Sequence, residues 1–223
     1  MKYSKEELKK DISRPPKQRK INLLFLGMSG AGKSYWSQKI AGQFGYKHFD
    51  IDDMLGRQKE LYDIVKDYPG KDLTRKLGNY LGMPWTKHFQ QRQKIYLELE
   101  KKLMAQDYPK GSILDLSGSS VYHPKELKKL LKNSLAIYLE VSEQFREKLF
   151  QVFLSDPKPI MWKEIFQKKP GQTNQKALQI CYPRLLEYRA KQYKKKADVT
   201  LPFEIHRNLK QGDEFLDEVF KKL

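Results

Sequence analysis

The chain has 223 residues, of which 39% are hydrophobic and 12% aromatic, so it can form one domain with a sizeable core. This composition excludes collagen, low-complexity sequence and most disordered classes. Lys and Arg total 44 against 27 Asp and Glu, and the net charge of +17 predicts an anionic partner such as nucleic acid, an anionic membrane or small phosphates.

Residues 1–20 form a basic arm with eight Lys or Arg and three acidic residues. Ser4 is a suitable N-cap for a short helix, and Pro15 and Pro16 end it. We expect a solvated tail outside the domain formed by residues 21–223, with anion binding as the alternative. The arm is too polar for a secretory signal and too acidic for a transit peptide.

Two further features indicate the compartment. No run approaches the roughly 18 apolar residues that span a bilayer, so we expect no membrane contact. The single cysteine, Cys181, excludes an intrachain disulfide and a cysteine-clustered metal site, and we expect it to be buried. These features predict a soluble, cytoplasmic protein.

Strands and helices alternate along the rest of the chain. Short apolar runs predict strands at residues 21–26, 46–50, 112–116, 134–141 and 198–201. Helical spacing predicts helices at residues 34–44, 89–104, 124–131, 142–153, 175–196 (interrupted near Pro183) and 212–222. Residues 61–83 predict loops and short helices. The alternation indicates an α/β fold of three layers, with helices flanking a parallel sheet.

A phosphate-binding motif follows the first predicted strand. Residues 27–34, Gly-Met-Ser-Gly-Ala-Gly-Lys-Ser, match G-x-x-x-x-G-K-[ST] between a strand and a helix. Such glycines let consecutive backbone N–H groups point at one phosphate, and the helix N-terminus adds positive potential. Lys33 would reach the terminal phosphates, and Ser34 would offer its hydroxyl to Mg²⁺. The predicted nucleotide-binding residues are Gly27, Ser29, Gly30, Ala31, Gly32, Lys33, Ser34 and Tyr35.

Three carboxylates are candidates for chemistry beside this loop. Asp50 and Asp52 follow a short strand, and alternation would place both on the same side of an extended segment. One would serve Mg²⁺ while the other accepts a proton from an acceptor hydroxyl. The alternative is an acidic turn with Asp53 as the N-cap of a helix at Met54. Asp115, inside an apolar strand, would hold Mg²⁺ or its water, and a simple hydrogen bond is the alternative.

These features together resemble shikimate kinase, within the P-loop small-molecule kinases of nucleoside monophosphate kinase type. The phosphate loop and the D-x-D pair match, and Ser117-Gly118-Ser119 stands in the place of the family's glycine triplet. Lys158-Pro159-Ile160-Met161 stands where the family's mobile lid has Arg-Pro-Leu-Leu. The spacing of Arg189, Tyr193, Ala197 and Asp198 also matches. The resemblance covers about residues 21–223.

The resemblance implies a P-loop kinase fold with a mobile lid at about residues 154–182, and phosphoryl transfer from ATP with Mg²⁺. Asp50 would assist Mg²⁺, together with Ser34 and Asp115. Asp52 would bind substrate hydroxyls and act as the base, and Lys158 would reach the ATP phosphates. The acceptor would contact Gly118 and bind Arg189 through its carboxylate.

One departure from the family concerns the acceptor. Leu97 takes the place of a second carboxylate-binding arginine, and the nearest substitute is Arg92. Shikimate is the first acceptor to test, and another small polyol or sugar acid is an alternative. The charge of +17 and the basic arm leave a nucleic-acid 5′-hydroxyl kinase as a second hypothesis. The basic stretch at residues 182–196 is either a nucleic-acid stripe or a solvated helix face. A non-catalytic ATP-binding module is the third.

Overall fold

A parallel sheet forms the centre of the molecule. The computed structural model describes residues 2–156 and 158–223. Within them the sheet has five strands in the order β2-β3-β1-β4-β5. They are β1 (Asn22–Leu26), β2 (Lys47–Asp50), β3 (Ser112–Asp115), β4 (Ser134–Leu139) and β5 (Val199–Leu201). The middle strands are buried along their whole length, as their unbroken apolar runs predict.

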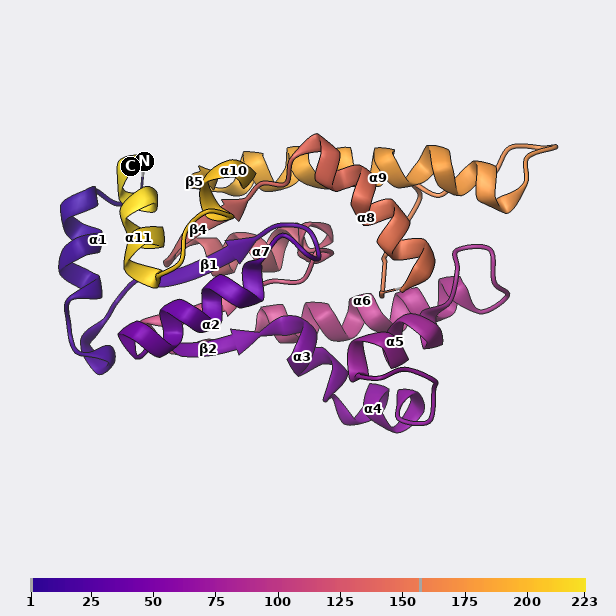
Figure 1. Ribbon diagram of the computed structural model, residues 1–223. Coiled ribbons are helices and arrows are strands. Elements are labelled where there is room, and N and C mark those ends of the chain that lie inside the picture. The colour runs from indigo at the N-terminus through magenta and orange to yellow at the C-terminus, as the bar shows by residue number, and fades with distance from the viewer. Residues whose placement is uncertain (1, 157) are drawn as a thin grey trace.

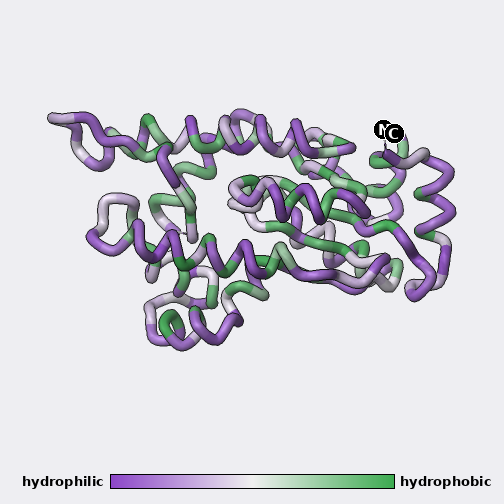
Figure 2. The backbone as a smooth tube through the Cα atoms, turned by 180° about the vertical axis from the view of Figure 1, so that it is seen from behind, coloured by the Kyte–Doolittle hydropathy of each residue, from purple (hydrophilic) through white to green (hydrophobic). Residues whose placement is uncertain are grey.

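Helices cover both faces of the sheet, which makes the fold the predicted three-layer α/β arrangement (Figure 1). On one face, α2 (Lys33–Phe44) contacts β1, β2 and β3 and packs on α11 (Gly212–Lys221). On the other, α7 (Pro124–Leu131) and α9 (Asn174–Lys196) contact β4, and α6 (Phe89–Ala105) packs on α7. Figure 2 shows the apolar segments gathered in the strands and alternating with polar ones along the helices.

Smaller helices extend the molecule beyond the carboxyl ends of the strands (Figure 1). After β2 come α3 (Ile51–Gly56), α4 (Lys59–Val65) and α5 (Leu73–Leu81). After β4, α8 (Glu143–Ser155) leads into an irregular segment, of which residues 158–173 are described, and then into α9. The short α10 (Phe203–His206) follows β5 and has no counterpart among the predicted elements.

The N-terminal segment is part of the packed molecule. Helix α1 (Lys5–Ile12) begins at a capping box, in which Ser4 Oγ accepts from the Glu7 amide and the Glu7 carboxylate accepts from the Ser4 amide. Leu8 and Ile12 lie one turn apart and are buried in the same apolar core as the sheet. The prediction of a solvated tail is therefore wrong, since only the outer face of α1 meets solvent.

Helix α9 runs without a break through Pro183, so the predicted interruption there is also wrong. Proline removes one backbone hydrogen bond, but the buried side chains on either side of Pro183 hold the helix against the core. Cys181 is one of these buried residues, as predicted. Among the described residues, no helix is both long and apolar enough to cross a membrane.

Candidate active site

The phosphate-binding loop lies at the carboxyl end of β1, the middle strand. Gly32 is the N-cap of α2 and has a φ of 97°, which a side chain would strain. A Cβ on Gly27 would lie 3.0 Å from the carbonyl oxygen of Leu139, so this glycine allows the loop to pass close to β4. Lys33 is the first residue of α2 and is buried, with its ammonium 3.5 Å from the Met28 carbonyl oxygen across the loop.

Ser34 meets two carboxylates from neighbouring strands. Its hydroxyl lies 2.6 Å from Asp115 Oδ2 and 3.3 Å from Asp50 Oδ2. Asp50 and Asp115 are register partners at the ends of β2 and β3, which explains how residues so distant in the sequence converge. One hydroxyl and two carboxylates are oxygen donors of the kind Mg²⁺ prefers when phosphates and water complete its shell. The described residues contain no set of three His, Cys, Asp or Glu side chains arranged to hold a metal.

Asp115 also faces the loop lysine. Its Oδ1 lies 3.8 Å from Lys33 Nζ, and both side chains are buried. Burial raises the pKa of Asp115, and the charge of Asp50 adds to this, whereas Lys33 and the Ser34 hydroxyl oppose it. A cation placed between Asp50 and Asp115 would relieve the mutual repulsion of the two carboxylates, which makes this position suited to Mg²⁺.

Asp52 lies next to this cluster, but it lies on a helix and not on the extended segment that the strand alternation predicts. Helix α3 starts directly after β2: Asp50 is its N-cap and accepts from the Asp53 amide at 3.1 Å, while Asp52 lies in its first turn. The prediction of an extended segment is therefore wrong, and so is the alternative prediction that Asp53 caps the helix. Asp53 instead pairs with Arg57 at 2.8 Å on the surface of α3.

The environment of Asp52 favours its protonated form. Tyr96 of α6, whose ring is buried, donates to Asp52 Oδ1 at 3.1 Å. Desolvation raises the pKa of Asp52 to about 7, Lys33 opposes this, and the charges of Asp50, Glu100 and Asp115 add to it. The carboxylate is nevertheless open to the water of the cavity it faces, which weakens the desolvation. A pKa above the ordinary value for aspartate brings this carboxyl group closer to the pH at which a general base works best.

A cavity of about 790 Å³ brings most of the predicted residues together. Its walls come from the phosphate loop, α3, α5, α6, α8, α9 and the segment after α8. Gly27, Ala31 and Asp115 are buried and are not in its lining, and Asp115 is hydrogen-bonded to Ser34, which is. The predicted residues that line it are Ser29, Gly30, Gly32, Lys33, Ser34, Tyr35, Asp50, Asp52, Gly118, Lys158 and Arg189.

The two serines that replace the family's outer glycines have a structural partner. Ser117 and Ser119 both donate to Glu100 Oε1, and the Ser119 bond measures 2.6 Å. His123 Nε2 lies 2.6 Å from the other oxygen of the same carboxylate. Glu100 is fully buried, and three hydrogen-bonding groups satisfy it there. The departure at the glycine triplet therefore builds a buried polar network beneath Gly118.

Arg189 lies next to Gly118 and lines the cavity. It is 7% exposed and donates from Nη2 to the Met161 carbonyl oxygen at 2.7 Å, while its Nε has no hydrogen-bond partner among the described residues. A Cβ on Gly118 would lie 3.2 Å from Arg189 Nη1, so the middle glycine of the triplet makes room for the guanidinium. Tyr193 donates to the Gly118 carbonyl oxygen at 2.6 Å and fixes this part of the chain.

The segment after α8 contributes Lys158, Pro159 and Ile160 to the cavity wall. Burial and the nearby Arg75 lower the pKa of Lys158. The segment is tied to α6, because Gln93 Oε1 accepts from the amides of Trp162 at 2.6 Å and Lys163 at 2.9 Å.

Two residues of the site, Tyr96 and Arg75, have no place in the sequence-based prediction. Tyr96 is one helical turn before Glu100 on α6, and this spacing was the available signal for a shared face. Arg75 lines the cavity and pairs with Asp156 at 2.5 Å, but nothing in the sequence relates α5 to the end of α8.

Arg92, the nearest residue that could substitute for the family's second arginine, does not reach the cavity. Arg92 instead donates to the Tyr80 carbonyl oxygen and the Tyr68 hydroxyl and lies over both rings. It is absent from the lining, and Leu97 is half-buried against the core. The cations that do face the cavity besides Lys33, Lys158 and Arg189 are Arg57 and Arg75.

The fold and the loop define the class: a three-layer α/β protein with the P-loop kinase fold. The structure is similar to that of shikimate kinase from Acinetobacter baumannii in complex with shikimate, with a TM-score of 0.50 and 17% identity over 93% of this chain and 95% of that one. It is also similar to shikimate kinase from Bacteroides thetaiotaomicron, with a TM-score of 0.53 and 14% identity over 90% and 97% of the two chains. The fold is thus shikimate kinase-like, as the motifs predicted, at a low level of identity. No model of a protein family matches the sequence, and no curated protein matches it either.

Proposed function

We propose that this protein is a kinase that transfers a phosphoryl group from ATP, with Mg²⁺, to a hydroxyl of a small anionic molecule. The observation that carries this proposal is the convergence of Lys33, Ser34, Asp50 and Asp52 in a single cavity, with the buried Asp115 in contact with Ser34 and Lys33. A site for binding nucleotide alone does not require a carboxylate with a raised pKa beside the metal ligands.

The phosphate loop and its lysine would bind and orient the nucleotide. Backbone N–H groups of residues 29–34 and the N-terminus of α2 favour negative charge. Lys33 and Lys158 would bind the phosphates from opposite walls of the cavity. Bound Mg²⁺, held through Ser34 and the Asp50 and Asp115 carboxylates, would neutralise charge on the transferred group.

Asp52 would orient the acceptor hydroxyl and take its proton. A base works best when its pKa is near the working pH, and the raised pKa of Asp52 moves it in that direction. Tyr96 holds the carboxylate in place through its hydroxyl and so acts as a positioning residue. Water excluded by the segment at residues 158–163 would otherwise compete as acceptor.

Arg189 supports an anionic acceptor. A deeply buried guanidinium with an unpartnered N–H is costly unless an anion meets it. Shikimate is the first acceptor to test, although Leu97 and the position of Arg92 leave one arginine fewer than the family uses. Other small hydroxy acids with one carboxylate therefore belong in the same test.

The test is an ADP-release assay with purified protein, ATP and Mg²⁺ against shikimate, other hydroxy acids, neutral sugars and a 5′-hydroxyl oligonucleotide. We expect release well above the acceptor-free rate with at least one anionic hydroxyl compound, and none in a matched Asp52→Asn preparation. Release with the oligonucleotide alone would assign the protein to the nucleic-acid kinases. Nucleotide binding without release in any arm would show a non-catalytic module.

A further inference from the structure

A second cavity, of about 770 Å³, lies at the opposite end of the sheet. Its walls come from the turn after α1, the start of β2 and the loop before β3, so it opens where the strands begin. Figure 1 shows α1 and its following turn at this end, away from the loop between β1 and α2. A five-residue strand is about 17 Å long, so the two cavities cannot hold one small ligand between them.

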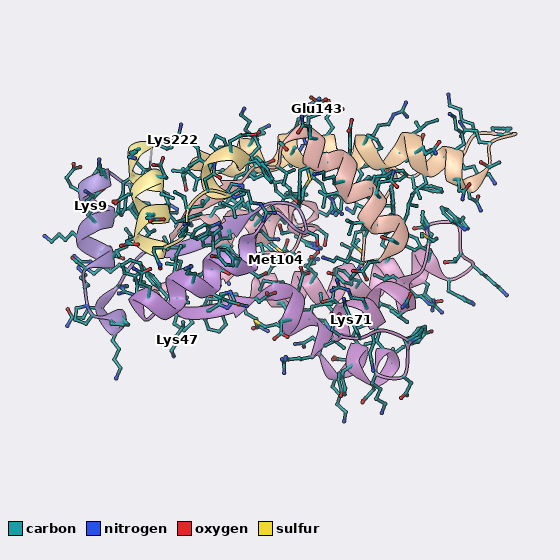
Figure 3. All side chains as sticks on the ribbon, in the orientation of Figure 1. Lys9, Lys47, Lys71, Met104, Glu143 and Lys222 are labelled. Carbon is teal, nitrogen blue, oxygen red and sulfur yellow. The ribbon has the colours of Figure 1, made fainter. Side chains whose placement is uncertain are left out.

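The charge of this cavity has one sign. Six lining residues are basic and none is acidic: Arg14, Lys17, Arg19, Lys20, Lys47 and Lys110. Asp11, which is buried beside it, pairs with Arg14 at 2.7 Å and accepts from the amides of Lys20 and Ile21. Within the described residues, none of the four lysines has a carboxylate within salt-bridge distance. A surplus of positive charge therefore remains in one recess (Figure 3 labels Lys47 at this end).

Arg19 is the observation that separates this recess from an ordinary basic surface. Its side chain is 5% exposed and lies over the Tyr46 ring, 4.0 Å from the centroid. Its Nε and Nη1 are buried and have no hydrogen-bond partner among the described residues. Buried guanidinium groups are normally paired, because a buried charge without an acceptor loses its hydration and gains nothing in return. Arg19 also lines the recess, and its Nη2 is not among these fully buried atoms, so an anion in the recess would meet the guanidinium there.

The backbone around Arg19 is closely packed. Gly111 has a φ of 69°, and a Cβ there would lie 2.5 Å from the Cβ of Arg19. The 3₁₀ turn η1 (Pro16–Gln18) and the Asp11 hydrogen bonds fix the chain that carries Arg19. These contacts hold the positive groups in place before a ligand arrives, which lowers the entropic cost of binding.

We propose that this cavity binds a compact small molecule carrying at least two phosphate groups, at a site separate from the phosphate loop. The volume falls within the range of small-molecule sites, roughly 300–1,000 Å³. The charges surround a recess contributed by three separate chain segments, whereas a nucleic-acid groove would present them along a stripe. This proposal does not depend on the transfer reaction, because it concerns residues at the other end of the sheet.

The test is calorimetric titration of the full chain with inorganic tripolyphosphate in Mg²⁺-free buffer. Lys33→Ala is present in every sample, so that the phosphate loop contributes little. We expect one site per chain, and at least a tenfold weaker affinity after Lys17→Gln with Lys110→Gln. The matched control, Lys125→Gln with Lys176→Gln, removes the same charge from exposed positions elsewhere and should change the affinity less than twofold.

Equal losses of affinity in the two double variants would overturn the proposal, because they would show binding to net charge alone. The absence of any binding site in the titration would also overturn it. A 5′-phosphorylated oligonucleotide that displaces tripolyphosphate and binds more tightly would overturn the small-molecule assignment in favour of nucleic acid. Arg19→Met tests the buried guanidinium directly: a circular dichroism spectrum like that of the parent together with unchanged affinity would also contradict the proposal. If Arg19→Met does not fold, the lysine pairs still decide.

Discussion

The two ends of the sheet differ in how they arrange charge. At the carboxyl end, the Ser34 hydroxyl lies 3.3 Å from Asp50 and 2.6 Å from Asp115, and Asp115 lies 3.8 Å from Lys33. Asp52 lines the same cavity. At the amino end, basic residues line the second cavity without an acid among them. Mixed charges at short range can bind a cation, move a proton and stabilise a transition state, whereas one sign of charge can only attract and hold an anion.

The largest expected effect tests which end carries the chemistry. Lys33→Ala should reduce turnover by about 10³-fold or more, because the buried ammonium would no longer stabilise the transferred group. Lys47→Ala, at the other end of the sheet, is the matched control and should leave turnover within twofold. Both are measured by ADP release under saturating ATP. A comparable loss in the two variants would contradict the division of roles between the two ends.

A second prediction separates structure from chemistry within the carboxyl end. Glu100→Ala should lower the free energy of unfolding by about 3–5 kcal/mol, because Ser117, Ser119 and His123 would lose their common buried partner. Urea unfolding measures it. Glu100→Gln keeps the shape and part of the hydrogen bonding, so its loss should be clearly smaller. An unchanged unfolding midpoint for Glu100→Ala would show that the network does not stabilise the fold.

Asp52→Asn is expected to cut turnover by about 10²-fold or more while nucleotide affinity changes little, because the base is lost and the phosphate loop is intact. The same substitution should make the fold more stable, although it lowers activity. The raised pKa means that ionised Asp52 destabilises the fold increasingly as pH rises from 3.8 through about 7, and asparagine removes this cost. At pH 8 the variant should therefore melt at a higher temperature than the parent. Normal turnover would show that Asp52 is not the base.

The pH profile of the parent gives a related but smaller effect. Because Asp52 must be ionised to accept the proton, kcat/KM should fall as pH drops below about 7, up to tenfold per pH unit. An ordinary aspartate would keep most of its activity down to about pH 5. A flat profile between pH 5 and 8, with the protein folded throughout, would contradict a raised pKa at the base.

Much of this molecule is predictable from local sequence. The strands, the main helices and the phosphate loop follow from apolar runs, helical spacing and one eight-residue motif, since each depends on neighbours in the chain. Sequence position also predicts that Asp50, Asp52 and Asp115 lie near one another, because parallel strands end at one edge of a sheet. Asp52 shows the limit of this reasoning, as it reaches the cavity from a helical turn rather than from a strand.

The rest depends on packing between distant segments. Tyr96 and Glu100 lie on a helix whose inner face is decided by contacts with α3 and α7, and Arg75 finds its partner Asp156 across the cavity. The packing of the N-terminal segment is hard to predict for the same reason. Its many basic residues suggest solvation, while only two apolar residues, Leu8 and Ile12, determine that α1 packs.

The smallest expected effect concerns the connection between α5 and the end of α8. Arg75 binds both oxygens of Asp156 and also pairs with Asp72, and its side chain is mostly but not fully buried. Because part-exposed ion pairs contribute little, Arg75→Gln should lower the free energy of unfolding by about 1 kcal/mol or less. A larger relative change is expected in ATP hydrolysis without acceptor, which should rise about two- to fivefold as water enters beside Lys158. Lys191→Gln, which breaks a surface pair with Glu187 outside the cavity, is the matched control and should leave this hydrolysis unchanged. If the two variants hydrolyse ATP at equal rates, the Arg75–Asp156 pair does not help to close the cavity.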